Sequence, residues 1–188
     1  RRASCPFDID RDRGVMAEGA GVLILENLEH ARARGVTAYA EILGYASCAD
    51  PKQGEDGSGL GKAMRMAVAN TGLDVHHIDH ISAHGPSDLE MDVVEVNMIK
   101  EVFGDHAYSI PVSSVKGCTG CPMGTGGVLQ LIGASLSLHE QIIPPTANLR
   151  TPDPRCDLDF PARSRMAQLE RIAINTHGFG RGNGCMVV

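Results

Sequence analysis

The pattern of hydrophobic and polar positions predicts several short strands along the chain. Residues 19–28 form an apolar run of strand length, which as a strand would be buried on both faces. Residues 36–47 alternate between apolar and polar positions, as a half-buried strand does. Shorter strands are predicted over 77–84 and 109–117, and 170–188 predicts two strands around a glycine-rich turn.

Helical spacing separates these predicted strands. It covers residues 28–35, 60–73, 87–104 and 126–141. We expect Ser87 or Asp88 to cap the third helix, and acids fill its first turns. The apolar stripe predicted for that helix consists of Val93, Val94, Asn97, Met98 and Val102. The last helix is rich in small and apolar residues, and we expect it to be buried.

Strands that alternate with helices, followed by a terminal hairpin, predict an α/β sheet flanked by helices. The length of 188 residues suits a single domain spanning 1–188. In such sheets the ends of the strands carry functional sites. His84, Lys116 and the turn 178–183 all lie at or just after the end of a predicted strand, and we expect them to share one cavity.

Composition narrows the classes of function. The net charge is −6 without a basic run, so we expect no nucleic-acid partner. The apolar runs are too short to cross a bilayer, and the first residues lack the apolar segment of a secretory signal. The six scattered cysteines are unlike a disulfide framework and indicate reduced thiols in the cytoplasm. The chain does not begin with Met, and we expect a processed product or part of something longer.

Alternative sites are weakly supported by the spacing of their residues. Asp8, Asp10 and Asp12 alternate as in a calcium loop, but its required Gly and Glu are absent, so a charged surface turn is favoured. The Cys-x-x-Cys of Cys118 and Cys121 could be redox-active or could bind zinc with nearby histidines. The histidines are His76, His77, His80 and His84. No second ligand pair completes a zinc signature, so we assign no metal, and the turn 178–183 lacks the helix of a dinucleotide site.

In combination, several segments resemble the carboxy-terminal half of β-ketoacyl-acyl-carrier-protein synthases, which are thiolase-fold condensing enzymes. They are "CPFDIDRDRGVMAEGAGVLILENLEHARARG", "ISAHGPSDLEMDVVEVNMIKEVFG", "VSSVKGCTGCPMGTGG", "PPTANLRTPDPRCDLDF" and "NTHGFGRGN". The resemblance covers nearly the whole chain and implies a thiolase-like α/β fold, with a mixed five-stranded sheet flanked by helices. It also makes the Cys-x-x-Cys incidental, because Cys121 occupies the place of the second histidine in the family's K-S-x-x-G-H segment.

The resemblance implies roles for individual residues. His84 matches the first catalytic histidine, Lys116 the lysine, and the backbone N–H of His177 an oxyanion donor. Supporting positions are Asp92, Glu95, Gln130 and Asn183. Substrate-binding positions, which would contact the phosphopantetheine arm or the acyl chain, are Pro86, Asp88 and Phe179.

Several of these positions depart from the family pattern. A thiol at Cys121 is a weaker hydrogen-bond donor than an imidazole, and losing one oxyanion donor costs about 10²–10³ in rate. Pro86 lacks the hydroxyl and N–H of the family's threonine. Gln130 replaces a buried Glu, and His177 stands where an apolar Phe gates the acyl pocket. None of the cysteines matches the nucleophile, which lies in the amino-terminal half of the family's fold, and Cys121 is a weak candidate to replace it.

The sequence therefore leaves more than one function open. The first is half of a condensing enzyme of fatty-acid or polyketide synthesis, which joins an acyl thioester to malonyl on acyl carrier protein. The second is a non-catalytic subunit similar to a chain-length factor, and a third is a module that only binds an acyl chain. We expect no bound cofactor beyond the carrier's phosphopantetheine arm. The expected partners are an amino-terminal half or a ketosynthase chain, in a homo- or hetero-oligomer, and acyl carrier protein; we expect the chain alone to be inactive.

Overall fold

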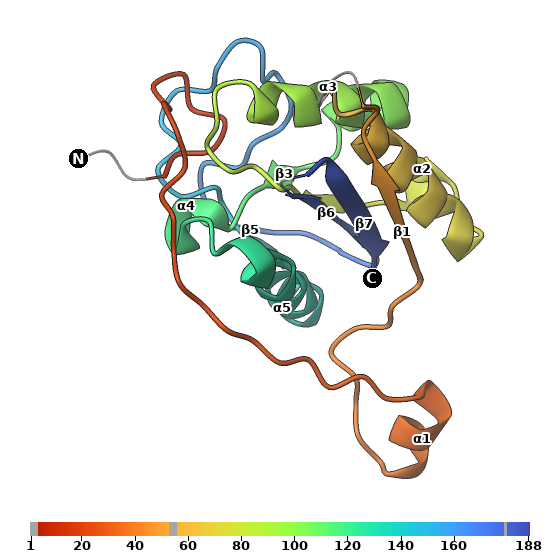
Figure 1. The fold of residues 1–188 in the computed structure, drawn as a ribbon. Coiled ribbons are helices and arrows are strands. Elements are labelled where there is room, and N and C mark those ends of the chain that lie inside the picture. The colour runs from red at the N-terminus through yellow and green to blue at the C-terminus, as the bar shows by residue number, and fades with distance from the viewer. Residues whose placement is uncertain (1–3, 53–55, 179) are drawn as a thin grey trace.

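A computed structural model describes residues 4–52, 56–178 and 180–188. Within these residues, five strands form one mixed sheet in the order β1-β7-β6-β2-β3 (Figure 1). The strands are β1 (Gly44–Ala49), β2 (His80–Ser82), β3 (Val112–Ser113), β6 (Ile172–Gly178) and β7 (Gly182–Val187). β2 runs parallel to β3 and β6, whereas β7 runs antiparallel to β6 and β1. The predicted mixed five-stranded sheet is confirmed.

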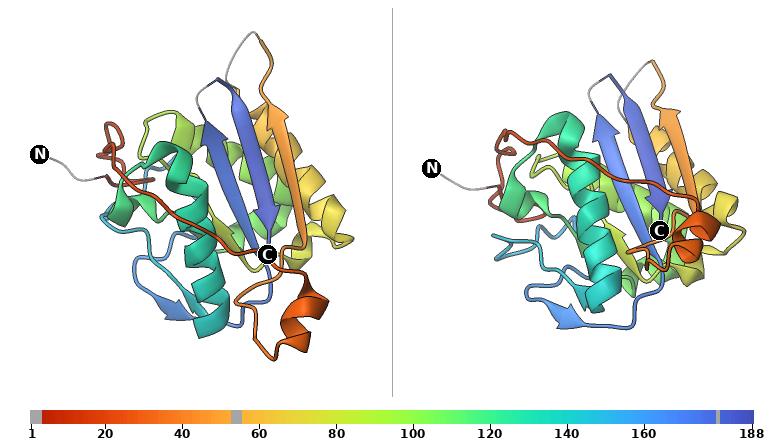
Figure 2. Two further views of the ribbon diagram at one scale, coloured as in Figure 1. Left: turned by 60° about the horizontal axis from the view of Figure 1, so that its bottom comes forward. Right: turned by 90° about the horizontal axis from the view of Figure 1, so that it is seen from below.

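Helices cover both faces of this sheet. α2 (Ser58–Thr71) and α3 (Met91–Phe103) lie on one face, and α5 (Gly126–Glu140) lies on the other (Figures 1 and 2). The shorter elements are α1 (Leu28–Ala33), α4 (Lys116–Thr119), the 3-10 turns η1 (Val75–His77), η2 (Gly104–Tyr108) and η3 (Met123–Thr125), and a separate pair of strands, β4 (Ile142–Ile143) and β5 (Arg165–Met166).

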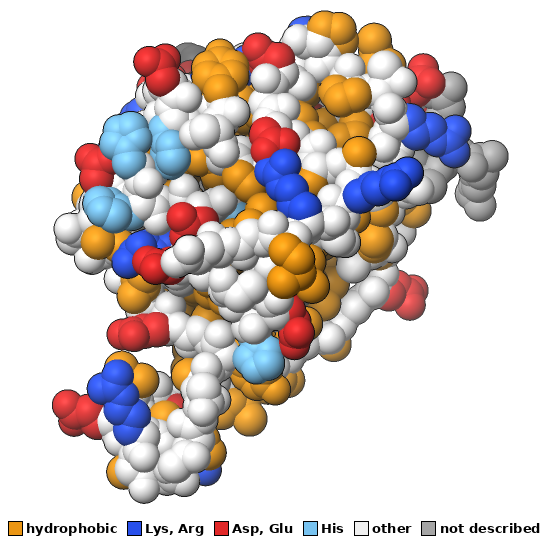
Figure 3. Space-filling view, turned by 180° about the vertical axis from the view of Figure 1, so that it is seen from behind, with side chains coloured by type: hydrophobic (Ala, Val, Ile, Leu, Met, Phe, Trp, Pro, Cys, Tyr) orange, Lys and Arg blue, Asp and Glu red, His pale blue; other side chains and the backbone are white. Residues whose placement is uncertain are grey.

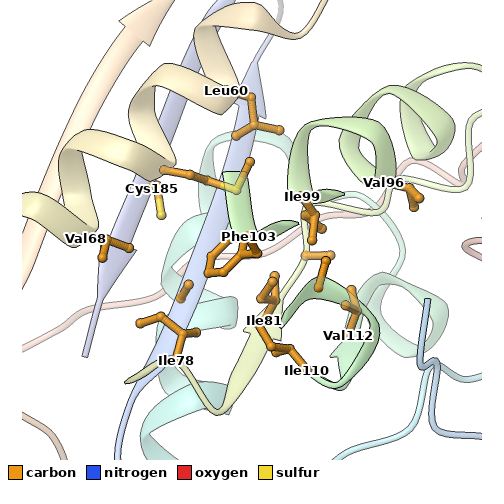
Figure 4. Close-up of a cluster of buried hydrophobic side chains, with 14 of the residues drawn as sticks. Leu60, Val68, Ile78, Ile81, Val96, Ile99, Phe103, Ile110, Val112 and Cys185 are labelled. Carbon is orange, nitrogen blue, oxygen red and sulfur yellow. The ribbon is translucent and has the colours of Figure 1, made fainter. Parts of the chain in front are cut away.

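The main core lies between the sheet and the α2–α3 layer. Figure 4 shows its aliphatic and aromatic side chains, among them Leu60 from α2, Ile99 and Phe103 from α3, and Ile81 from β2. All four are at most 2 % exposed. Another cluster packs under α5 and contains Leu131, Ala134, Ile143, Leu169, Ile172, Ile174 and Val188. The two layers fix the strands from both sides and so fix the ends that carry the polar residues.

The strand predicted over residues 19–28 is wrong for this structure. The segment is extended, but it lies in no sheet, and the exposed fractions are 87 % for Val22, 91 % for Ile24 and 72 % for Leu25. An apolar run becomes a strand only where a neighbouring strand accepts its backbone hydrogen bonds. The alternating segment 36–47 likewise becomes a strand only from Gly44, where it pairs with β7. Residues 17–43 form a projecting arm that carries α1 (Figure 1).

The stripe predicted for α3 is correct only in part. Val93, Met98 and Val102 are half-buried against the main core, but Asn97 is exposed. The fully buried apolar residues of the helix are Val96, Ile99 and Phe103. The acids Asp92 and Glu95 also lie on this buried face, because their carboxylates accept backbone N–H groups of loops packed against it. The N-cap position of α3 is Glu90 rather than Ser87 or Asp88. The Oδ1 of Asp88 accepts the N–H groups of residues 90 and 91 from two residues before that position.

Burial of α5 is confirmed only for one side. Leu131 and Ala134 are buried, whereas Ile132 and Leu136 are 37 % and 47 % exposed. The exposed side faces the arm across a hollow of about 730 Å³. The apolar residues of α5 therefore lie on two surfaces of the helix, one packed against the sheet and the other exposed.

We predict that Ile99→Ala destabilises the chain by about 2–5 kcal/mol, because it removes buried methyl groups and leaves a cavity. Ile24→Ala, at a position 91 % exposed, is the matched control and should change stability by less than about 0.5 kcal/mol. Urea unfolding of the three proteins measures both effects. Equal destabilisation by the two variants would contradict this assignment of the core.

Candidate functional site

The carboxyl ends of β2, β3 and β6 meet at one edge of the sheet because these strands run parallel. His84 follows β2, Lys116 begins α4 just after β3, and His177 lies near the end of β6. The Nζ of Lys116 donates to the carbonyl oxygen of His84 and lies 3.3 Å from its Nδ1. The backbone N–H of His177 donates to the same Nδ1 over 3.2 Å. The structure thus brings together residues that the sequence placed on three separate strand ends.

The loop after β2 approaches the loop after β3 closely, and a glycine permits this. Gly85 has a φ of +34°, and a Cβ added to it would lie 2.7 Å from the Cβ of Ser114. The hydroxyl of Ser114 donates to the carbonyl oxygen of Gly85 over 2.8 Å. This approach holds His84 next to Lys116.

The carboxylate of Glu95 fixes the backbone on which His84 sits. It accepts the N–H of His84 over 2.9 Å and that of Gly85 over 2.8 Å. It also accepts the side-chain amide of Asn175, from the middle of β6, over 3.1 Å. Burial raises the pKa of Glu95, and these hydrogen bonds oppose that rise. A carboxylate on α3 therefore joins the loop after β2 to the middle of β6.

The charged groups of the site influence one another through a buried, weakly solvated region. Burial lowers the pKa of Lys116, which is 2 % exposed, while Glu95 opposes that shift. Burial, and then the neighbouring Lys116 and His177, lower the pKa of His84 well below its ordinary value. His84 is therefore neutral at pH 7.

The hydrogen bonds also identify the tautomer of neutral His84. Its Nδ1 accepts the N–H of His177, so the ring proton resides on Nε2. The residue consequently presents a neutral Nε2–H donor.

Asp92 lies one turn before Glu95 and fixes the amino-terminal segment. Its carboxylate accepts the N–H groups of Phe7 and Ser87 over 2.7 and 3.1 Å and lies 3.2 Å from the Nε of Arg11. Burial raises the pKa of Asp92 to about 7, against the lowering effect of these neighbours. Arg11 also donates to Asp153 over 2.9 Å, so its buried cation has more than one anionic partner.

Gln130 and Asn183, both predicted as supporting residues, lie in the site. Gln130 is fully buried, and its Nε2 lies within 3.1 Å of the carbonyl oxygens of Ser82, Ala83 and Asn175, to which it donates. The amide therefore links the end of β2 to β6. Asn183, 2 % exposed at the start of β7, places its Oδ1 2.6 Å from the Nδ1 of His177.

Asn175 is a site residue that the sequence analysis missed. It is a fully buried polar residue among the apolar positions of β6, and this contrast is the signal that could have identified it.

Cys121 lies in the loop after α4 and is half-buried. Its backbone pairs with the segment where the arm begins, since its N–H donates to the carbonyl oxygen of Val15 over 2.7 Å and its carbonyl oxygen accepts the N–H of Ala17 over 3.1 Å. The thiol contacts the sulfur of Met123 at 3.9 Å, and it lies near enough to Lys116 to affect its pKa. Cys118 and Cys121 are free thiols.

Two of the positions proposed to bind substrate, Pro86 and Asp88, lie on the loop between β2 and α3. Pro86 is half-buried, two residues after His84. Asp88 is also half-buried, and its carboxylate accepts the N–H groups of residues 90 and 91. Phe179 lies outside the described residues. The substrate-binding role of all three stays a prediction.

The alternative sites considered from the sequence look different in the structure. Asp8 is 4 % exposed and accepts backbone N–H groups of residues 10, 150 and 151, so the expectation of a charged surface turn is wrong for it. His80 is buried in β2 and bonds to Ser113, whereas His76 and His77 lie on η1. Across residues 4–52, 56–178 and 180–188, no three His, Cys, Asp or Glu side chains gather as metal ligands would. None of the helices described is long and apolar enough to cross a membrane.

Comparisons with known proteins agree with this geometry. The family model described as "Beta-ketoacyl synthase, C-terminal domain" matches residues 39–150. A 3-oxoacyl-[acyl-carrier-protein] synthase 2 of Synechocystis is 43 % identical over 96 % of this chain and 45 % of its own length. A putative polyketide beta-ketoacyl synthase 1 of Streptomyces cyaneus is 41 % identical over 95 % of this chain and 43 % of its own. The chain thus spans about half the length of these relatives.

Solved structures of ketosynthases have the same fold as this chain. One is a ketosynthase of a type II polyketide synthase in complex with its acyl-carrier protein, with a TM-score of 0.94 and 36 % identity over 98 % of this chain and 47 % of that one. Another is the ishigamide ketosynthase/chain length factor, with a TM-score of 0.92 and 34 % identity over 99 % of this chain and 46 % of that one. These similarities confirm the thiolase-like α/β fold expected from the sequence.

We predict that Glu95→Gln destabilises the chain by about 1–3 kcal/mol, because the amide leaves at least one buried N–H group without an acceptor. Loss of the anion should also lower the pKa of Lys116 further. Urea unfolding and NMR titration of the lysine Cε groups measure the two effects. Glu101→Gln, a surface replacement on the same helix, is the control, and an equally mild effect at Glu95 would contradict the role assigned to it.

Proposed function

The chain belongs to the β-ketoacyl synthase family, and from this membership we propose that it forms the carboxy-terminal half of a β-ketoacyl-acyl-carrier-protein synthase. The reaction is the decarboxylative condensation of an acyl thioester with malonyl on acyl carrier protein, in fatty-acid or polyketide synthesis. One of the relatives described above is named a 3-oxoacyl-[acyl-carrier-protein] synthase, and another is named a polyketide beta-ketoacyl synthase. The phosphopantetheine arm of the carrier would bring the malonyl thioester to the edge of the sheet where β2, β3 and β6 end.

The observation that carries this proposal is the contact of His84 with Lys116 and His177. When malonyl loses carbon dioxide, negative charge develops on the thioester oxygen, and a positioned donor stabilises it. Neutral His84 offers its Nε2–H for that purpose, since its Nδ1 is occupied. Lys116 fixes the carbonyl of His84 and makes the surrounding potential more positive. Together these groups favour an enolate over the neutral thioester.

The backbone N–H of His177 has a more limited part than the family resemblance implies. It donates to His84 in this structure and thereby orients the imidazole. An additional role as donor to a tetrahedral oxyanion requires the N–H to be shared with that oxygen or released to it. We therefore propose that orienting His84 is its first function.

The exposed arm supports the need for an amino-terminal half. Apolar side chains of the arm, including Val22, Ile24 and Tyr39, face a hollow that is closed on the other side by Ile132 and Leu136 of α5. Figure 3 shows hydrophobic side chains on the body next to the arm. Contiguous apolar surface of this kind marks an interface. The amino-terminal half would cover it and would contribute the nucleophilic cysteine.

A second candidate function is a non-catalytic subunit like a chain-length factor. Cys121 favours it, because a half-buried thiol at the second-histidine position leaves His84 without the usual partner donor. Pro86 also favours it, since it has no hydroxyl to bind phosphopantetheine. Such a subunit would pair with an active ketosynthase and shape its acyl tunnel. The two candidates differ in whether this chain's own His84 takes part in the chemistry.

We predict that this chain alone forms no β-ketoacyl product from acyl and malonyl groups on acyl carrier protein, and that its complex with the amino-terminal half from the same source does. Product analysis by mass spectrometry measures both. In the complex, Cys121→His should increase malonyl decarboxylation, because it supplies an imidazole donor. Product formation by the chain alone, or a complex that forms none, would refute the proposal.

We also predict that His84→Ala lowers malonyl decarboxylation by that complex by about 10²–10³-fold, since it removes the neutral donor. His76→Ala, at an exposed position on η1, is the control and should leave the rate unchanged. The release of labelled carbon dioxide measures both rates. If His84→Ala has no effect while the complex remains active, the result supports the non-catalytic subunit and contradicts a catalytic role of His84.

A further inference from the structure

A second imidazole lies beside His84, and the family resemblance gives it no role. The ring centroids of His84 and His177 are 5.8 Å apart with an interplanar angle of 66°. His177 is half-buried at the end of β6. The position that normally supplies a second imidazole is Cys121, whose thiol contacts Met123. His177 is therefore the imidazole that could act together with His84.

The amide of Asn183 determines which nitrogen of neutral His177 carries the proton. The Nδ2 of Asn183 donates to the carbonyl oxygen of Arg181 over 3.2 Å, which fixes the orientation of the amide. Its Oδ1 then faces the Nδ1 of His177 at 2.6 Å. An amide oxygen only accepts, so Nδ1 must carry the proton. Asn183 is 2 % exposed, so water does not replace it readily.

The two rings therefore hold opposite tautomers. Neutral His84 has its proton on Nε2 and donates from there, as its bonds to His177 and Lys116 require. Neutral His177 has its proton on Nδ1 and leaves Nε2 as an acceptor. Only protonation of Nε2 turns His177 into a donor at that atom.

The surroundings of His177 contain groups of both signs. His84 faces it from the loop after β2, with the ammonium of Lys116 from α4 behind that ring. The carboxylate of Glu95 on α3 lies beneath, bonded to the backbone of His84. Arg181 lies in the adjoining turn and reaches the site through its carbonyl oxygen.

We propose that His177 is the second imidazole of this site and that it donates to the developing enolate only in its imidazolium form. The inference rests on the proposed function. The bond between the carboxylate carbon and the α-carbon breaks, carbon dioxide leaves, and the electron pair forms the enolate. The enolate oxygen accepts hydrogen bonds from Nε2–H of His84 and of protonated His177, and no proton is transferred. Neutral His177 presents a lone pair instead, so decarboxylation declines as His177 loses its proton.

NMR of the chain labelled with ¹⁵N-histidine tests the tautomers without any activity. Long-range ¹H–¹⁵N spectra above the titration range should show His177 with a protonated Nδ1 and His84 with a protonated Nε2. The signals are assigned by their loss in His177→Phe and His84→Gln. Asn183→Ala should move the proton of His177 to Nε2. A wild-type His177 with its proton on Nε2 would overturn the inference, whether or not Asn183→Ala folds.

The rate of decarboxylation by the complex with the amino-terminal half tests the donor role. Below the titration of His177, His177→Phe should lower the rate by about 10²-fold and should remove the decline toward high pH. When Cys121→His supplies another imidazole, His177→Phe should cost far less. His76→Phe, the same replacement at an exposed histidine, is the control.

The outcomes of this experiment separate the two proposals. A pH profile unchanged by His177→Phe, in an active complex, would overturn the donor role alone. The same conclusion follows if His177→Phe costs as much with Cys121→His as without it. A complex that releases no carbon dioxide would overturn both the proposed function and the donor role, even with the expected tautomers.

Discussion

The buried carboxylate of Glu95 is the interaction on which the geometry of the site depends. It accepts the consecutive N–H groups of His84 and Gly85 and the amide of Asn175, so one side chain of α3 joins the loop after β2 to the middle of β6. Without these acceptors, the loop after β2 would carry buried N–H groups with no partner. An ionised carboxylate on the buried face of a helix is costly by itself. Its hydrogen bonds and the nearby Lys116 offset that cost, and each of them also positions a residue of the site.

A second buried carboxylate of α3 binds the amino-terminal segment in a similar way. Asp92 lies on the same face, three residues earlier, and accepts the N–H of Phe7 while pairing with Arg11. Arg11 in turn bonds to Asp153, so segments that are far apart in sequence meet under the site. Phe7 stacks on Phe160 with ring centroids 4.3 Å apart, which adds an apolar contact to this polar junction. The site is therefore supported from below by buried charges that satisfy one another.

The sequence placed His84, Lys116 and the turn 178–183 at strand ends and so predicted that they lie together. The structure brings together His84, Lys116 and His177, which directly precedes that turn, because the parallel strands end at one edge of the sheet. The sequence was insufficient where a property depends on a neighbour that the local pattern does not encode. Residues 19–28 have the composition of a strand, yet no strand in the described chain pairs with them. The periodicity of α3 could not reveal that Asp92 and Glu95 face inward, since only the fold shows which loop N–H groups lie opposite. Asn175 was missed for a different reason, since a polar residue among the apolar positions of β6 is visible in the sequence.

The site is hydrogen-bonded within the chain, whereas the arm exposes apolar side chains. This difference indicates how a partner would act on the chain. The site is held by hydrogen bonds within this chain, namely those described for His84, Lys116, Gln130 and Asn183. Another polypeptide is therefore not needed to form this geometry. The arm is the opposite case, since Val22, Ile24 and Leu25 are exposed and α5 leaves Leu136 uncovered. A partner that covered the arm would gain apolar burial, which is non-directional and favours association without specifying chemistry. The partner would thus enclose a site that is already formed. This chain alone determines which groups of the site donate and which accept hydrogen bonds, including the imidazole of His177.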